Sequence, residues 1–231
     1  MLDTILKSQN SKSYKGHSSN SFNMLPGDPK GSPDESYSHK KIETLVFIDS
    51  NFLSKVSGHF GKGKYLIYDL ITFSENLAKK QKLICKKIYY YTAPPFQSSI
   101  PSKEEERRKD GYDRFVDKLR KRGALVREGR CQRLKADGKF EYKQKGVDIL
   151  IAMDLMSVPL KFKEIKKIIL IASDSDFVPV INNLEEQEIK TILYTYYEKK
   201  RNTNFSRSNH LIKSVNKYVL LTKQDFEEAK K

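Results

Sequence analysis

Aspartates stand where two short apolar runs end. The run at residues 167–173, "KIILIAS", is followed by Asp174 and Asp176, and "TLVFID" at 44–49 ends in Asp49. Short, continuous apolar runs are typical of strands that are buried on both faces. In open parallel sheets, ligands bind at the carboxyl ends of the strands, where the strand order reverses. If the two strands are neighbours at that reversal, these aspartates converge. Asp148, at the start of "VDILIA", could face the same crevice.

Such a cluster needs a counter-charge. Two carboxylates about 4 Å apart raise the free energy by about 4 kcal/mol at an effective dielectric constant of about 20. Bound protons or cations relieve this repulsion, and oxygen ligands favour Mg²⁺ or Mn²⁺. A divalent ion of this kind binds a phosphodiester oxygen and lowers the pKa of an attacking water. The cluster therefore predicts phosphoester chemistry with Mg²⁺ or Mn²⁺ as the cofactor.

Helix capping is the alternative role for some of these acids. Asp176 stands where the N-cap of the next helix would lie, and Asp148 could be only an acid in a first helical turn. Asp154 lies in the middle of a predicted helix, so we assign it to structure or to the surroundings of the site rather than to the chemistry. We expect capping to leave Asp49 and Asp174 unexplained.

The elements that position these acids alternate along the chain. We predict strands at 44–49, 83–92, 124–131, 167–173 and 188–197, and helices at 65–81, 103–123 (with a possible break near Gly111), 147–160 and 176–187. Residues 132–146 contain an Asp-Gly turn and form a hairpin or loop. A short helix, a short strand and a closing helix follow after 206. This alternation predicts an α/β fold, a three-layer α/β/α sandwich around a central, mostly parallel sheet.

Composition narrows the class of protein. The 231 residues carry a net charge of +15, which favours nucleic acid as the partner over a membrane. The two isolated cysteines indicate a reducing compartment, and no zinc spacing, P-loop, signal peptide or membrane span is found, so we expect a cytoplasmic protein. Residues 1–40, rich in Ser, Asn, Lys, Gly and Pro, predict a disordered tail before a single domain at 41–231.

Four segments together resemble the NYN domains. "FIDSNFL", "VREGR", "KGVDILIAMDL" and "IILIASDSDFVPVI" occur in the order and spacing of that family, and the most similar branch is the LabA-like one, within the PIN-like nuclease superfamily. The resemblance covers residues 43–221. It implies a PIN-like (Rossmann-like) sandwich, a presumed ribonuclease activity, and an Mg²⁺ or Mn²⁺ site at Asp49, Asp148, Asp174 and Asp176. Ser173 and Asn51 resemble the polar residues that surround the family's metal site.

One motif departs from the family. The common first motif is Asp-Gly-X-Asn, whereas Ser50 here replaces the glycine and Phe52 stands at the asparagine position. This motivates a second hypothesis, an RNA-binding module without catalysis. A third, a phosphatase for small phosphate esters, fits the acids but not the charge of +15.

Basic residues near the same sheet edge are the predicted contacts with RNA. These are Arg127 and Arg130 after the third strand, and Lys199, Lys200 and Arg201 after the fifth, with Phe205 as a ring on which a base could stack. Single-stranded RNA is thus the predicted partner. The sequence leaves open whether the chain also forms a homodimer or binds a protein partner.

Overall fold

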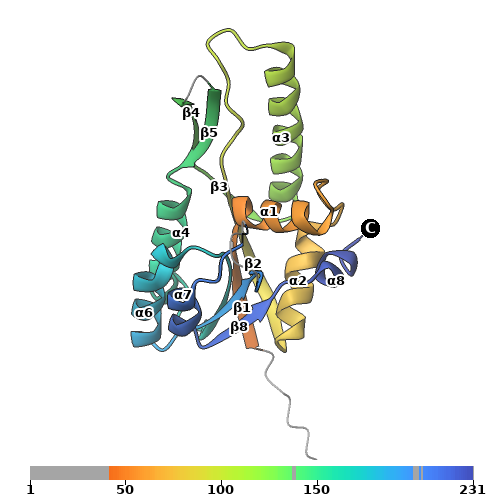
Figure 1. The fold of residues 1–231 in the computed structure, drawn as a ribbon. Coiled ribbons are helices and arrows are strands. Elements are labelled where there is room, and N and C mark those ends of the chain that lie inside the picture. Colours follow the sequence, from red (N-terminus) through yellow and green to blue (C-terminus); the bar gives the residue numbers. More distant parts are fainter. Residues whose placement is uncertain (1–41, 137–138, 200–202, 204, 231) are drawn as a thin grey trace, which may run out of the picture. The chain divides into compact units, whose positions relative to one another are not determined.

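The fold is α/β, as predicted. The computed structural model describes residues 42–136, 139–199, 203 and 205–230. Six parallel strands form one sheet in the order β3-β2-β1-β6-β7-β8 (Figure 1). Their bounds are β1 (Ile42–Asp49), β2 (Leu83–Thr92), β3 (Leu125–Glu128), β6 (Lys167–Ile171), β7 (Lys190–Thr195) and β8 (Lys217–Leu220).

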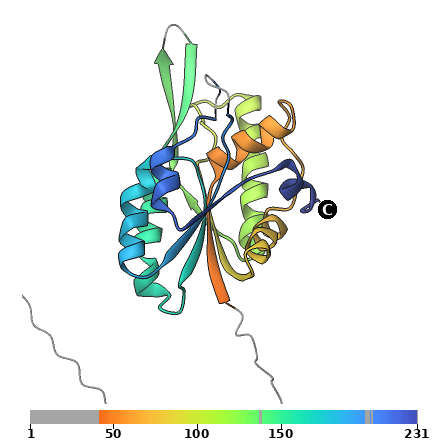
Figure 2. The same ribbon diagram turned by 60° about the horizontal axis from the view of Figure 1, so that its bottom comes forward.

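Helices cover both faces of this sheet and give it two cores. One face carries α1 (Ser50–Phe60), α2 (Leu70–Lys80), α3 (Lys103–Lys121) and α8 (Lys223–Glu227). The other carries α4 (Val147–Met156), α5 (Val158–Lys161), α6 (Val178–Glu186) and α7 (Asn209–Ser214), as Figure 2 shows. Strand alternation divides the tyrosines of β2 accordingly: Tyr90 belongs to the first core, Tyr89 and Tyr91 to the second. The three-layer sandwich is thereby confirmed.

The strand order reverses between β1 and β6. From β1 the chain continues outward through β2 and β3, and from β6 it continues in the opposite direction through β7 and β8. The two central strands pair in parallel, with Phe47 opposite Leu170 and Ile48 opposite Ile171. Their carboxyl ends therefore meet at the same edge, which confirms the neighbourhood on which the predicted aspartate cluster depends.

Local chemistry moves some element boundaries away from the prediction. The helix expected over 65–81 begins only at Leu70, because the Asp69 side chain caps it by accepting a hydrogen bond from the Thr72 N–H. The helix expected to break near Gly111 is continuous, since one interior glycine costs only about 1 kcal/mol. A capping box between Ser102 and Glu105 fixes where it begins. Helix α1, directly after β1, was not predicted.

Residues 130–145 form an antiparallel hairpin. Its strands β4 (Arg130–Ala136) and β5 (Lys139–Lys145) make a separate two-stranded sheet. The hairpin was one of the two predicted alternatives for this segment, although the Asp-Gly turn itself lies outside the described residues, as does the predicted tail at 1–40. The predicted third strand ends at Glu128, so that Cys131 belongs to the hairpin.

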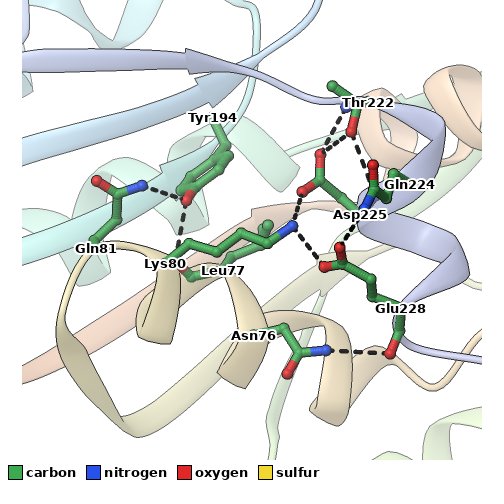
Figure 3. Close-up of polar contacts among 9 residues, drawn as sticks. All are labelled: Asn76, Leu77, Lys80, Gln81, Tyr194, Thr222, Gln224, Asp225 and Glu228. Carbon is green, nitrogen blue, oxygen red and sulfur yellow. Dashed lines mark hydrogen bonds and ion pairs between the residues drawn. The ribbon is translucent and has the colours of Figure 1, made fainter.

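Helix α8 is held against α2 by a charged network (Figure 3). The ammonium of Lys80 lies 2.6 Å from Asp225 and 2.7 Å from Glu228, while Asp225 also caps α8 through Thr222. These contacts fix α8 on the face of the sheet that α2 covers. Among the described residues, no helix is long and apolar enough to cross a membrane.

Candidate active site at the carboxyl edge of the sheet

A cavity of about 870 Å³ opens at the point where the strand order reverses. Five of the residues predicted from the sequence line it: Asp49, Asn51, Asp148, Ser173 and Asp174. They come from the end of β1, the start of α1, the first turn of α4 and the segment after β6. Segments more than 100 residues apart in the sequence thus contribute polar side chains to one pocket.

Asp49 is the most buried of the four predicted metal-binding aspartates, with 9% of its surface exposed. One carboxylate oxygen caps α1, accepting hydrogen bonds from the N–H groups of Asn51 at 2.9 Å and Phe52 at 3.2 Å. Burial, with a smaller contribution from the negative charge of Asp148, raises the pKa of Asp49 to about 6, although these two bonds and the charge of Lys55 oppose the rise. The site thus holds a carboxylate whose ionisation is disfavoured.

Asp148 lies close enough to the other three aspartates for their charges to repel one another. It lies in the first turn of α4 directly after Gly146, whose φ of +79° lets the chain leave β5 and enter the helix. Partial burial raises the pKa of Asp148, and the charges of Asp174 and Asp176 add to this effect. The four predicted aspartates are therefore close enough to influence one another.

Capping accounts for more of these acids than we expected. Asp49 caps α1, and Asp174 caps the short 3₁₀ helix η1 (Ser175–Phe177) by accepting a hydrogen bond from the Asp176 N–H at 2.9 Å. The expectation that capping leaves these two unexplained is wrong, and so is the N-cap role for Asp176. Asp49 is the last residue of β1, and Asp174 lies three residues after the end of β6, so each side chain starts a helix and also lines the pocket.

Asp154 has a different environment. It is 7% exposed and accepts hydrogen bonds from the Tyr91 hydroxyl at 3.0 Å and from Arg127 Nε at 3.0 Å and Nη2 at 3.3 Å. Through these bonds Asp154 connects α4 to Tyr91 on β2 and to Arg127 on β3. Two guanidinium nitrogens of Arg127 are therefore already engaged, and its contact with RNA stays a prediction.

The donor chemistry of the pocket fits a divalent cation. The charge of Asp148 raises the pKa of Asp49, and the charges of Asp174 and Asp176 raise that of Asp148, a repulsion that Mg²⁺ or Mn²⁺ would relieve. Within the described residues, no three His, Cys, Asp or Glu side chains are grouped to hold a metal ion directly. Mg²⁺ usually keeps several waters and takes one or two carboxylates, which this spread of acids can supply. The four-aspartate metal site stays a prediction.

The predicted RNA contacts differ in their surroundings. Arg130 and Lys199 are exposed, whereas Lys200 and Arg201 lie outside the described residues. Phe205 lines the cavity but is only 9% exposed, and its ring centroid lies 5.0 Å from those of His59 and Tyr196. Much of the ring that was predicted to stack a base is thus already packed within the protein.

Other lining residues were missed by the sequence analysis. Lys55 lies one turn along α1 from Asn51, and without that helix it had no assigned place. Tyr196 follows β7 at the same edge as the aspartates, and its hydroxyl lies 3.0 Å from His59 Nε2. The strand-end rule that found Asp49 would also have found Tyr196. Tyr142 and Lys143 enter from the hairpin, which pattern alone did not place beside the pocket.

Comparison with known proteins agrees with this architecture. The family model of the NYN domain matches residues 43–220. The chain is also similar to the crystal structure of a protein of unknown function from Vibrio parahaemolyticus, with 14% identity, 80% of this chain and 96% of that chain covered, and a TM-score of 0.51. At this identity the similarity concerns the fold alone. No curated protein matches the chain.

Proposed function

The chain belongs to the NYN domain family, within the PIN-like nuclease superfamily, and we propose that it is a metal-dependent ribonuclease that cleaves single-stranded RNA. The observation that carries the proposal is the aspartate-lined cavity at the strand reversal of a chain with a net charge of +15. The basic surface attracts a polyanion, and the acids prepare the site for a cation at the scissile phosphate. Motif order favours the LabA-like branch of the family.

The aspartates would hold Mg²⁺ or Mn²⁺. Asp49 is oriented by two backbone N–H groups, and the Asp174 carboxylate by one, so neither side chain has to be ordered when the cation binds. A bound ion would supply Lewis-acid stabilisation of the phosphate and a water of lowered pKa. Asp148 and Asp176 complete the negative field around it.

Other residues of the pocket would receive the substrate. Lys55 lines the cavity near Asp49, where its ammonium can bind a phosphate oxygen without displacing the acids. Asn51 and Ser173 offer amide and hydroxyl groups at the rim for the sugar-phosphate backbone. Each is exposed, so binding does not require the protein to open.

The test is cleavage of labelled single-stranded RNA with Mg²⁺, with Mn²⁺ and with chelator. We expect metal-dependent cleavage by the wild type and none by Asp174→Asn, in which the asparagine still caps η1. Asp117→Asn on α3 removes the same charge from an exposed position and should cleave normally. Cleavage by Asp174→Asn at the wild-type rate would overturn the site assignment.

A non-catalytic RNA-binding module is the second candidate. It is favoured by Phe52, which is 4% exposed and packs into the core at the position where the family carries asparagine. Its signature would be RNA bound in either metal without cleavage, with a steep loss of affinity as salt rises. A phosphatase for small esters would instead turn over a small phosphate ester and show a shallow salt dependence.

A further inference from the structure

The β4–β5 hairpin projects from the domain beside the cavity. Its two strands pair only with each other among the described strands, and Figures 1 and 2 show the hairpin extending beyond the end of the six-stranded sheet. An isolated two-stranded ribbon is only marginally stable by itself in water. This ribbon is nonetheless attached to the rim of the acidic pocket, which makes it a candidate for contact with whatever enters there.

One face of the hairpin is continuous with the cavity. Directly opposed residues of an antiparallel pair lie on the same face. The opposed pairs Cys131–Gln144, Arg133–Tyr142 and Lys135–Phe140 therefore share one face. Cys131, Tyr142 and Gln144 line the cavity, so this face begins at the pocket and continues outward along the ribbon.

Flat, π-bearing groups line up along this face. The Arg133 guanidinium carbon lies 4.6 Å from the ring centroids of both Phe96 and Phe140, and Phe96 lies 5.7 Å from Tyr142. Phe140 and Tyr142 are 54% and 50% exposed. Arg133 and Phe96 thus fix the orientation of rings whose remaining surface is open to solvent. Exposed aromatic surface of this kind marks a binding site rather than a packed core.

The hairpin is also strongly basic. Residues 130–145 carry six basic and two acidic side chains. Arg130 and Lys145 lie directly opposite each other, and neither has an ion-pair partner in the described part of the chain. Like charges opposed across strands destabilise the pair, and a nearby phosphate chain would relieve that repulsion. Open rings interleaved with positive charge are the features with which proteins bind unpaired nucleic acid.

We propose that the face formed by Arg133, Phe140 and Tyr142, with Phe96, binds the unpaired nucleotides of the substrate by base stacking and leads the strand into the aspartate pocket. This rests on the proposed function and adds to it the surface that would bind the single-stranded substrate. Seven residues of strand span about 23 Å, and bases stacked about 3.4 Å apart would place roughly seven nucleotides along it. We call this face the aromatic platform. Bases in a duplex are already stacked and have no free faces for the rings, so the aromatic platform selects single strands.

The absence of tryptophan from the chain allows a direct test. Full-length Phe140→Trp carries a single tryptophan, which lies on the platform and can be excited selectively over the tyrosines, and stacking of a base should quench its emission. The titrations use a 12-nucleotide single-stranded RNA and the same sequence as a blunt duplex, both in chelator so that nothing is cleaved. We expect quenching by the single strand and little by the duplex. Tyr65→Trp, at a residue that is 74% exposed in the loop before α2, is the control and should not respond.

Affinity provides the second measurement. Phe140→Ala and Tyr142→Ala should each weaken binding of the single strand by roughly 5- to 150-fold, because one stacked base contributes about 1–3 kcal/mol. Tyr65→Ala should bind as the wild type does. Circular dichroism and thermal unfolding establish that the variants are folded, and Phe140→Tyr, which keeps a ring, should restore affinity.

The outcomes separate this proposal from the nuclease proposal. Metal-dependent cleavage by the wild type, with no quenching in Phe140→Trp and unchanged affinity in both alanine variants, would overturn the platform and leave the nuclease in place. Stacking without cleavage in any metal would keep the platform and overturn the nuclease. Equal quenching by the duplex would overturn the selection of single strands. Failure of the folded wild type to bind RNA, with capture of a protein by this face, would overturn both.

Discussion

Two buried aspartates, Asp49 and Asp154, have opposite surroundings. They are 9% and 7% exposed, and both contact elements that end at the carboxyl edge of the sheet. Asp154 is neutralised by Arg127 and accepts the Tyr91 hydroxyl, whereas Asp49 has no ion-pair partner in the described part of the chain and faces Asp148. The protein therefore pairs one buried aspartate with a basic side chain and leaves the other without one, as the proposed cation site requires.

The other buried aspartates strengthen this contrast. Asp69 pairs with Arg122 and Asp225 pairs with Lys80, so that of the four aspartates buried within the described ranges only Asp49 lacks a basic partner at ion-pair distance. An unpaired buried charge costs several kcal/mol unless something compensates it. Proteins keep such groups at functional sites, which is why we place the metal beside Asp49 rather than beside Asp154.

The largest expected effect is on catalysis, in Asp148→Asn. Its side chain does not cap α4 and is exposed, so the substitution should leave the thermal midpoint unchanged or slightly higher. We expect cleavage to fall about 1,000-fold, equivalent to about 4 kcal/mol of transition-state stabilisation. Initial rates at saturating Mg²⁺ measure it. A folded variant with more than a tenth of the wild-type rate would remove Asp148 from the active site.

Asp154→Ala should lower the stability of the fold, whereas Asp148→Asn should lower the rate of cleavage. It leaves the buried Tyr91 hydroxyl without its acceptor and Arg127 without its partner, and we expect a loss of about 3 kcal/mol in the free energy of unfolding. Urea titration measures this. The double variant Arg127→Met/Asp154→Leu should recover part of the loss, because no uncompensated charge remains. A stability equal to the wild type in Asp154→Ala would end the contrast between the two acids.

The carboxyl-edge pocket could be predicted from the sequence because it depends on few assumptions. Apolar runs ending in Asp49 and Asp174, together with the rule that ligands bind at the strand reversal, suffice to bring these residues together. Asp49 and Asp174 do line one cavity, even though the ends of the neighbouring helices were misplaced in the prediction. The continuous apolar runs that identify the strands are visible in the sequence, whereas the adjacency of β1 and β6 was a condition of the prediction, which the sheet order meets.

The ion pairs between buried aspartates and arginines could not be predicted from the sequence pattern. Arg127 and Asp154 are 27 residues apart, and Arg122 and Asp69 are 53 apart, so their pairing depends on how helices pack on the sheet. For the same reason Arg127 was assigned to RNA before its carboxylate partner was known. The aromatic platform also escaped prediction, because period-two alternation in 130–145 shows that two faces exist but not which face borders the pocket.

Asp49→Asn should reveal the cost of the unpaired acid as a dependence on pH. The unfolded chain releases this proton near pH 3.8 and the folded one near 6. Between these values the folded state binds more protons, so this group's contribution to stability falls as pH rises. Without metal, the variant should match the wild type near pH 4 and exceed it by up to about 3 kcal/mol at pH 7, since asparagine still caps α1. Chemical denaturation in chelator at both pH values measures the difference, and an equal gap at both would contradict it.

The smallest effect is expected from Lys80→Met. Like Asp154, Asp225 is a buried acid whose basic partner is 39% exposed, but the Lys80 ammonium also contacts the half-exposed Glu228 (Figure 3). Water can therefore replace much of what the substitution removes, and Asp225 keeps its hydrogen bonds to Thr222. We expect a loss of about 1 kcal/mol with unchanged cleavage, and the loss should shrink in high salt. A loss as large as that of Asp154→Ala would mean that the hydrogen bonds from Thr222 do not compensate the buried Asp225 carboxylate once its basic partner is removed.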